Sequence, residues 1–313
     1  MPEIMTLPEY AKGLEKTSIE RPLIETFAEH SDIVQALPFD GFSGAAYEGY
    51  RETDIGTAGF RAINEAAGSS KGKIAPFQET SFPIDTILKV DKAILLRHGE
   101  SRRAKEEAMQ MKRQSQLFTD TFIDGDNTSN PKEFNGLKAR AKDSAGRLIH
   151  NSGASGGAAL SLAALDEAID NTANPTHLIM SRAMKRRFIA AMRNTSLTGH
   201  ILQTRDGVGK PVLSYADLPI LTGYPKDRHS LLLPFNEVAS GGGSAVTTSI
   251  FVVSFMDGGL KGIQLKSIEA RDMGLLEDAV NYGTNVSWDV GLVDEGDFCV
   301  TRLDSVADGA IVA

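Results

Sequence analysis

The sequence predicts an α+β fold, in which helices and strands occupy separate stretches of the chain. Three observations support this class. Residues 101–122 carry apolar side chains at alternating spacings of three and four residues, which is typical of one long helix. Residues 41–84 are divided by glycines and flanked by short strand-like pieces. The C-terminal part contains further strand-like stretches, including residues 285–292 and 298–303.

The composition excludes several classes of protein. A chain with 41% hydrophobic and 24% charged residues is ordinary for a folded protein, so disorder is not expected. The net charge of −8 argues against a dedicated DNA-binding protein, although not against one that merely encloses DNA. The single cysteine, Cys299, excludes an intramolecular disulfide. No stretch approaches the roughly 20 apolar residues that a membrane helix needs.

Residues 1–40 are expected to form helices with breaks. Pro8 suits the first position of a helix, and Thr17 and Glu20 have the spacing of a capping box. An apolar stripe follows over residues 19–27, and Pro38 ends the helical signal.

The glycine-rich segment 41–84 is best interpreted as a long two-stranded hairpin with an irregular tip. Strand-like pieces at 46–52 and 80–84 flank it, and the small polar run 68–73 suits a solvated end. Such a hairpin cannot bury a core of its own, so we expect a neighbouring subunit to cover it. The candidate contact residues are Phe60, Lys71, Lys73 and Phe77. Exposed aromatic side chains on a hairpin are better explained as anchors for a partner than as core.

The long helix is predicted over residues 101–122, which corresponds to roughly 33 Å. Its apolar stripe is expected to bury Met111, Phe118 and Phe122, with charged residues on the other faces. Gly125 and the polar run 126–130 end the helix.

A compact α/β unit is expected after a loop-rich stretch at 131–158. Its predicted parts are a helix at 160–171, a strand at 177–180, a helix capped by Ser181, a hairpin formed by 210–215 and 219–223, and an apolar strand at 250–255. The capped helix carries a basic run, best interpreted as a solvated face or an ion-pairing interface: Arg182, Lys185, Arg186, Arg187 and Arg193.

One short motif resembles an enzyme signature. Arg97-His98-Gly99-Glu100 is similar to the strand-end motif of the histidine phosphatase superfamily, where a histidine attacks a phosphoryl group. The other histidines lie in no matching context, and the motif runs directly into the long helix. A turn at a helix start is therefore the favoured interpretation, with the phosphatase kept as the enzyme alternative.

No other catalytic, cofactor or metal motif is complete. Gly207-Val-Gly-Lys210 is followed by Pro211, which lacks the hydroxyl of a P-loop. Neither a nucleophile elbow nor a recognised metal-ligand spacing occurs. We therefore predict no catalytic residue, no cofactor and no metal.

The order of these parts resembles the Hong Kong 97-like fold of tailed double-stranded-DNA phage major capsid proteins, in its short-chain branch. The local amino-acid sequence is also similar to that of this family, notably at residues 122–126, 133–137, 209–220, 247–253 and 286–292. The resemblance covers nearly the whole chain. Arg97 to Glu100 and the long loop 224–245 depart from it.

The resemblance implies five segments: an N-terminal arm at 1–40, an extended hairpin loop at 41–84, a peripheral domain with a spine helix at 85–154, an axial domain at 155–252, and return strands of the peripheral domain at 253–313. It also implies self-assembly into pentamers and hexamers of an icosahedral shell. That shell would enclose DNA without sequence-specific binding. The chain start resembles the arm itself, so a separate scaffolding protein is expected, together with a portal protein.

The expected location is the virion capsid, assembled in the cytoplasm of a host bacterium, with no membrane partner. An encapsulin-like compartment shell is the closer alternative. Some capsids crosslink from the hairpin loop, but Lys71 and Lys73 are expected to be solvated rather than crosslinked.

Overall fold

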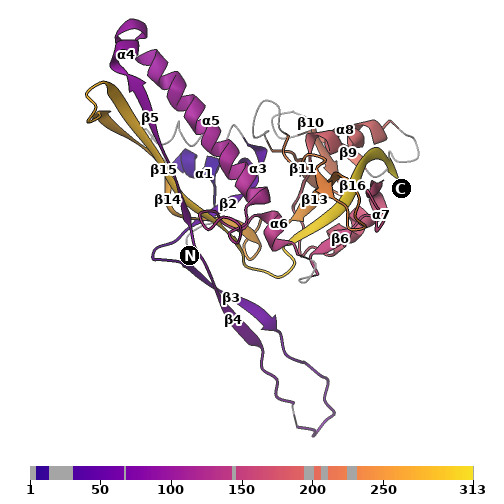
Figure 1. Ribbon diagram of the computed structural model, residues 1–313. Helices are drawn as coiled ribbons and strands as arrows, with labels where there is room; N and C mark the ends of the chain where they lie inside the picture. Colours follow the sequence, from indigo (N-terminus) through magenta and orange to yellow (C-terminus); the bar gives the residue numbers. More distant parts are fainter. Residues whose placement is uncertain are drawn as a thin grey trace.

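The computed structural model describes residues 5–13, 31–66, 68–142, 146–193, 201–205, 211–223 and 231–312. These residues form an α+β fold with three sheets of five, nine and two strands. Figure 1 shows the five-stranded sheet with the long helix on one side of the molecule, the nine-stranded sheet on the other, and the two-stranded hairpin projecting from between them. The predicted fold class is confirmed.

The five-stranded sheet has the order β1-β2-β14-β15-β5. Its strands are β1 (Met5–Thr6), β2 (Pro38–Gly41), β14 (Leu260–Leu275), β15 (Asn281–Asp294) and β5 (Phe82–Asp91). Short helices α1 (Leu7–Gly13) and α3 (Asp32–Ala36) precede β2. Ser31 caps α3, because its side chain accepts a hydrogen bond from the Val34 amide. The capping box and apolar stripe predicted at residues 17–27 lie outside the described residues.

The predicted spine helix is α5 (Glu100–Asp124), which is 25 residues long and ends at Gly125 as expected. Met111, Phe118 and Phe122 are all buried, which confirms the predicted face. The Phe118 ring lies 4.9 Å from the ring of Trp288 in β15 and 6.1 Å from that of Phe39 in β2, measured between centroids. The helix and the five-stranded sheet therefore share one aromatic core.

The nine-stranded sheet has the path β6-β16-β13-β8-β11-β10-β9, with β12 beside β13 and β7 beside β16. Its strands are β6 (Leu148–His150), β7 (Ala158–Ser161), β8 (His177–Ile179), β9 (Ile201–Arg205), β10 (Pro211–Tyr215), β11 (Leu218–Leu221), β12 (Glu237–Val238), β13 (Ala245–Val253) and β16 (Val300–Val312). The segment 253–313 therefore contributes strands to both large sheets.

Helices α7 (Leu162–Asp170) and α8 (Arg182–Ala191) pack on this sheet around a second core that includes Leu165, Phe188 and Val306. Ser181 caps α8 as predicted, since its hydroxyl accepts a hydrogen bond from the Met184 amide at 3.1 Å. The predicted hairpin is present as β10 and β11. The short helix α6 (Leu137–Arg140) follows the spine helix. Among the described residues, no helix is both long and apolar enough to cross a membrane.

The two-stranded hairpin is confirmed, but one of its predicted strands is wrong. Strand β3 (Tyr47–Asp54) pairs with β4 (Lys73–Glu79), not with residues 80–84. Residues 82–91 form β5, in which exposed side chains alternate with partly buried ones up to the buried Val90, and which joins the five-stranded sheet beside β15. The alternation of residues 82–90 fits a strand with one buried face, so this segment joins the body rather than the hairpin.

Candidate assembly interface

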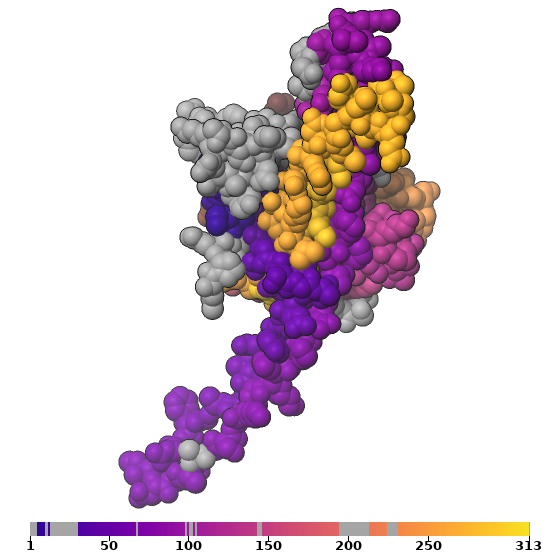
Figure 2. Space-filling model, turned by 90° about the vertical axis from the view of Figure 1, so that its left-hand side faces the viewer, coloured from indigo at the N-terminus to yellow at the C-terminus, as the bar shows by residue number. Residues whose placement is uncertain are grey.

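The hairpin formed by β3 and β4 stands away from the rest of the chain, as both views show (Figure 1 and Figure 2). The two strands pair with each other and with no other strand of the described residues. Large apolar side chains lie uncovered along it: Tyr50, Ile55, Phe60, Ile63 and Ile74. A row of exposed apolar side chains on an unsupported ribbon marks a surface for a partner.

The four candidate contact residues fall into two places rather than one site. Phe60 and Lys71 lie in the tip between the strands, and both are exposed. Lys73 begins β4, is also exposed, and forms an ion pair with Asp54 at 3.9 Å. The tip thus presents an exposed aromatic ring and exposed cationic side chains.

Phe77 belongs to the shaft of the hairpin. Its half-buried ring covers Gly49 on the opposite strand, where a β-carbon would meet the ring at 2.4 Å. The guanidinium group of Arg51 lies 5.1 Å from the centre of the same ring. Phe77 therefore stiffens the hairpin by packing across it, since the ring occupies the space that a larger side chain at residue 49 would need.

A first polar cluster holds the root of the hairpin. The Tyr47 hydroxyl donates a hydrogen bond to Glu295 at 2.5 Å, and the Lys261 ammonium group contacts Glu295 at 2.8 Å and Asp40 at 3.1 Å. Burial lowers the pKa of Lys261, but its bonds to Glu295, Tyr47 and Asp40 outweigh burial and raise the pKa above its usual range. Lys261 therefore stays charged and ties β14 to the hairpin.

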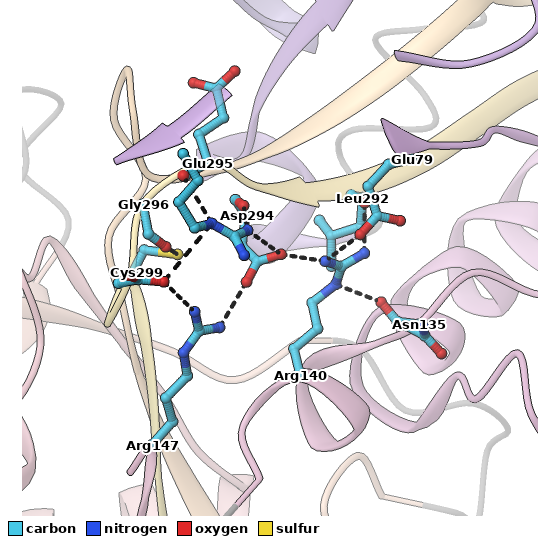
Figure 3. A network of polar contacts seen from close by, with 11 residues as sticks. Glu79, Asn135, Arg140, Arg147, Leu292, Asp294, Glu295, Gly296 and Cys299 are labelled. Atoms are coloured by element: carbon cyan, nitrogen blue, oxygen red, sulfur yellow. Dashed lines mark hydrogen bonds and ion pairs between the residues drawn. The ribbon is translucent and has the colours of Figure 1, made fainter. Parts of the chain in front are cut away.

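A second cluster is built around the buried carboxylate of Asp294, at the end of β15 (Figure 3). Arg140 of α6 forms an ion pair with Asp294 and donates to the Leu292 carbonyl at 2.7 Å. Arg147 contacts the other carboxylate oxygen at 2.6 Å. Arg51 of the hairpin reaches the same carboxylate at 3.6 Å and donates to the main-chain carbonyls of residues 294 and 295.

The Asp294 cluster joins both hairpin strands to the body. Arg51 comes from β3, and Glu79 at the end of β4 accepts a hydrogen bond from Arg140 at 2.9 Å. Burial raises the pKa of Asp294, but Arg140, Arg147 and Arg51 outweigh burial and hold the pKa below its ordinary value. The carboxylate therefore stays ionised and fixes the direction in which the hairpin leaves the body.

Sequence reasoning missed this cluster. The only local signal is the acidic run Asp294 to Asp297 directly after an apolar strand. The arginines that neutralise it are far away in the chain, because Arg51 precedes Asp294 by 243 positions and Arg140 by 154. Single-sequence reading offers no means to pair charges over such separations.

The phosphatase-like motif lies between two helices. Arg97 and His98 end helix α4 (Lys92–His98), Gly99 has a positive φ of 72°, and Glu100 begins α5. The strand end required by the phosphatase signature is therefore absent at this point of the structure. No group of three metal-ligating side chains occurs among the described residues.

One protein-family model matches part of the chain. The family model for major capsid protein GP7 matches residues 16–164. No curated protein sequence matches the chain.

Solved structures share the fold at low sequence identity. The SrpI encapsulin complex from Synechococcus elongatus PCC 7942 matches with a TM-score of 0.65 and 14% identity, over 90% of this chain and 89% of the encapsulin chain. The structure from Microbacterium phage Oxtober96 matches with a TM-score of 0.61 and 10% identity, over 88% and 90%. The capsid of a native GTA particle matches with a TM-score of 0.58 and 13% identity, over 90% and 91%. At these identities the likeness establishes the fold.

Proposed function

We propose that this chain is a shell-forming major capsid protein, and that copies of it associate as pentamers and hexamers of an icosahedral shell around phage double-stranded DNA. The match of residues 16–164 to the major capsid protein family and the fold shared with phage capsid structures support this proposal. The observation that carries this proposal is the hairpin, whose apolar side chains have no cover within the described chain. In the shell, Phe60, Lys71, Lys73 and Phe77 contact a neighbouring subunit.

The proposal includes the further partners implied by the fold. DNA is enclosed without sequence-specific binding, which suits a chain with a net charge of −8. A separate scaffolding protein and a portal protein take part in assembly, which occurs in the cytoplasm of a host bacterium. The division into arm, hairpin, peripheral and axial segments belongs to the same proposal.

Removing the hairpin tip tests the assembly role directly. Residues 55–72 are replaced by a two-residue Asn-Gly turn. Asp54 and Lys73 are paired across the hairpin, and Asn-Gly is a preferred turn for joining two paired antiparallel strands. We expect a circular dichroism spectrum and a melting temperature close to those of the wild type, because shortening a loop changes closure entropy little. Light scattering and electron microscopy should show no shells. Normal shells from this variant would refute the proposal.

An encapsulin-like compartment is the second candidate, favoured by the match to the SrpI encapsulin complex. Particle size and nucleic-acid content distinguish the two. Particles from infected or expressing cells that hold protein cargo and no DNA would favour the compartment.

The chain acts as a structural protein rather than as an enzyme in this proposal. The protein and its His98→Ala variant are to be assayed on a phosphate ester. Turnover that is present in the wild type and absent in the variant would contradict the structural role.

A further inference from the structure

Helices α7 and α8 carry opposite charges. Helix α7 contains no lysine or arginine, and its charged residues are Asp166, Glu167 and Asp170. Helix α8 contains no acidic residue, and its charged residues are Arg182, Lys185, Arg186 and Arg187. Each helix buries its apolar face against the nine-stranded sheet, so the charges lie on the outer sides. Figure 1 shows both helices on the side of the molecule away from the five-stranded sheet.

Several of these charges lie at the helix end where the helix dipole is unfavourable to them. Glu167 and Asp170 occupy the last turn of α7, where the helix dipole is negative. Arg182 and Lys185 occupy the first turn of α8, where the dipole is positive. Neither placement stabilises an isolated subunit.

Contacts within the subunit compensate only part of this charge. Arg187 pairs with Asp308 at 2.7 Å, and Asp166 accepts a hydrogen bond from the Tyr215 hydroxyl at 2.6 Å. Within the part of the chain that the structure describes, Glu167, Asp170, Lys185 and Arg186 form no ion pair. Two complementary faces are therefore left open on one domain.

We propose that the acidic face of α7 in one copy binds the basic face of α8 in the next copy. The contact joins two different surfaces of the chain, and in a head-to-tail arrangement such a contact generates a ring when the rotation closes. It rests on the proposed function, since it assigns a contact between neighbouring subunits of one ring. A polyanion such as DNA would neutralise α8 but leave the acids of α7 uncompensated, so a second copy accounts for both faces.

Charge reversal on each face and on both together tests this contact. The basic-face variant is Lys185→Glu with Arg186→Glu, and the acidic-face variant is Glu167→Lys with Asp170→Lys. We expect each to lose ring and shell formation in sedimentation and electron microscopy. The variant with all four changes should recover it, since the attraction is restored with reversed sign. In the wild type, assembly should slow as salt rises, because salt screens exposed charges.

Melting of the dissociated subunits supplies a second readout. The acidic-face variant places two lysines in the last turn of α7, so it should melt roughly 1–2 °C above the wild type while failing to assemble. In the basic-face variant only Lys185→Glu lies in the first turn of α8, so this variant should melt close to the wild type while failing to assemble. This combination separates loss of a contact from loss of the fold. If a charge-reversal variant does not fold, the neutral pairs Lys185→Gln with Arg186→Gln and Glu167→Gln with Asp170→Asn replace it, with reduced assembly and reduced salt dependence expected.

Three results would overturn the proposal. The first is wild-type assembly rates in either two-residue variant. The second is a four-residue variant that folds but does not recover. The third is a basic-face variant that still forms shells, but shells without DNA, which would show that α8 binds nucleic acid rather than a second copy. A wild-type protein that forms no shells under the same conditions would instead contradict the proposed function.

Discussion

The spine helix and the hairpin are both long, and both carry aromatic side chains, yet among the residues that the structure describes only the helix has its apolar side covered by the same chain. The apolar stripe of α5 packs against β2 and β15, where Phe118 is fully buried against Trp288. On the hairpin formed by β3 and β4, Phe60 and Ile55 lie open to solvent. The stability of the subunit therefore depends on α5, whereas the assembly contact that we propose depends on the hairpin. A change in α5 should act mainly on subunit stability, and a change at the hairpin tip mainly on association.

The largest effect on stability is expected for Phe118→Ala. Loss of a fully buried ring from the shared core should lower the free energy of unfolding by about 3–5 kcal/mol. Urea unfolding of the dissociated subunit measures it. Lys112→Ala on the exposed face of the same helix is the control and should change stability by less than about 0.5 kcal/mol. Similar losses from both variants would mean that the core does not lie where α5 meets the sheet.

The next effect concerns the joint between the hairpin and the body of the subunit. Asp294→Asn keeps the shape of the side chain but leaves Arg140 and Arg147 without their common counter-ion. We expect a loss of about 2–3 kcal/mol in urea unfolding. Hydrogen exchange in β3 and β4 should also rise. Asp297→Asn is the control, because Asp297 touches Arg147 at 3.5 Å from a side chain that is 51% exposed, and it should cost less than about 1 kcal/mol. Equal costs would show that burial of Asp294 is unimportant.

The same cluster predicts a pH dependence. The pKa of Asp294 is lowered in the folded protein, so its ionised form contributes stability above the unfolded-state pKa of about 3.9. That contribution is lost as the pH falls from there through the folded-state value. The difference in melting temperature between the wild type and Asp294→Asn should therefore shrink below about pH 4. A difference that stays constant down to pH 2 or so would contradict this assignment.

A much smaller effect on stability is expected for Phe60→Ala. The ring is fully exposed, so the free energy of unfolding should change by less than about 0.5 kcal/mol. The assembly rate in light scattering should fall about tenfold if the ring anchors the tip on a neighbour. Ser69→Ala in the same tip is the control. Unchanged assembly by Phe60→Ala would place the anchor elsewhere on the hairpin.

Neither Lys71→Arg nor Lys73→Arg is expected to change the band pattern of intact particles in denaturing electrophoresis. Both side chains are exposed, and Lys73 lies beside Asp54 of its own hairpin. Intact particles should run as single subunits in denaturing electrophoresis. A ladder of covalent multimers that either variant removes would show that the tip is crosslinked in the shell.

The two regions also differ in how far the sequence predicts them. The spine helix follows from local spacing, because Met111, Phe118 and Phe122 repeat with the helical period and Gly125 ends it. The hairpin follows only in outline. Its glycines predict turns and flexibility but do not determine the register of the two strands, so the sequence suggests residues 80–84 as the strand that Lys73–Glu79 in fact supplies. The alternation of exposed side chains with mostly apolar inward ones from Phe82 to Val90 indicates instead that this segment is a strand of the five-stranded sheet.

The candidate site is less predictable than the fold. Exposure of Phe60 follows from the glycine-rich context, but the packing of Phe77 over Gly49 depends on the register of the two strands. The Asp294 cluster depends on three arginines that tertiary structure alone brings together. Local pattern therefore predicts the elements, whereas long-range pairing determines how they are joined.

The polar joint at the hairpin root also has a mechanical consequence. Strand β3 has eight residues, so the tip lies at least about 26 Å from the root, and a load on the tip acts on the root as a torque. Arg51, Tyr47 and Glu79 resist that torque through directional bonds to β15, α6 and the loop that follows β15. Strand β15 lies beside β5, which leads directly into α4 and the spine helix. A force that a neighbouring subunit exerts on the tip would thus be transmitted through the hairpin and β15 to β5 and the spine helix. The ion pairs of the Asp294 carboxylate determine how stiff this connection is at the hairpin root.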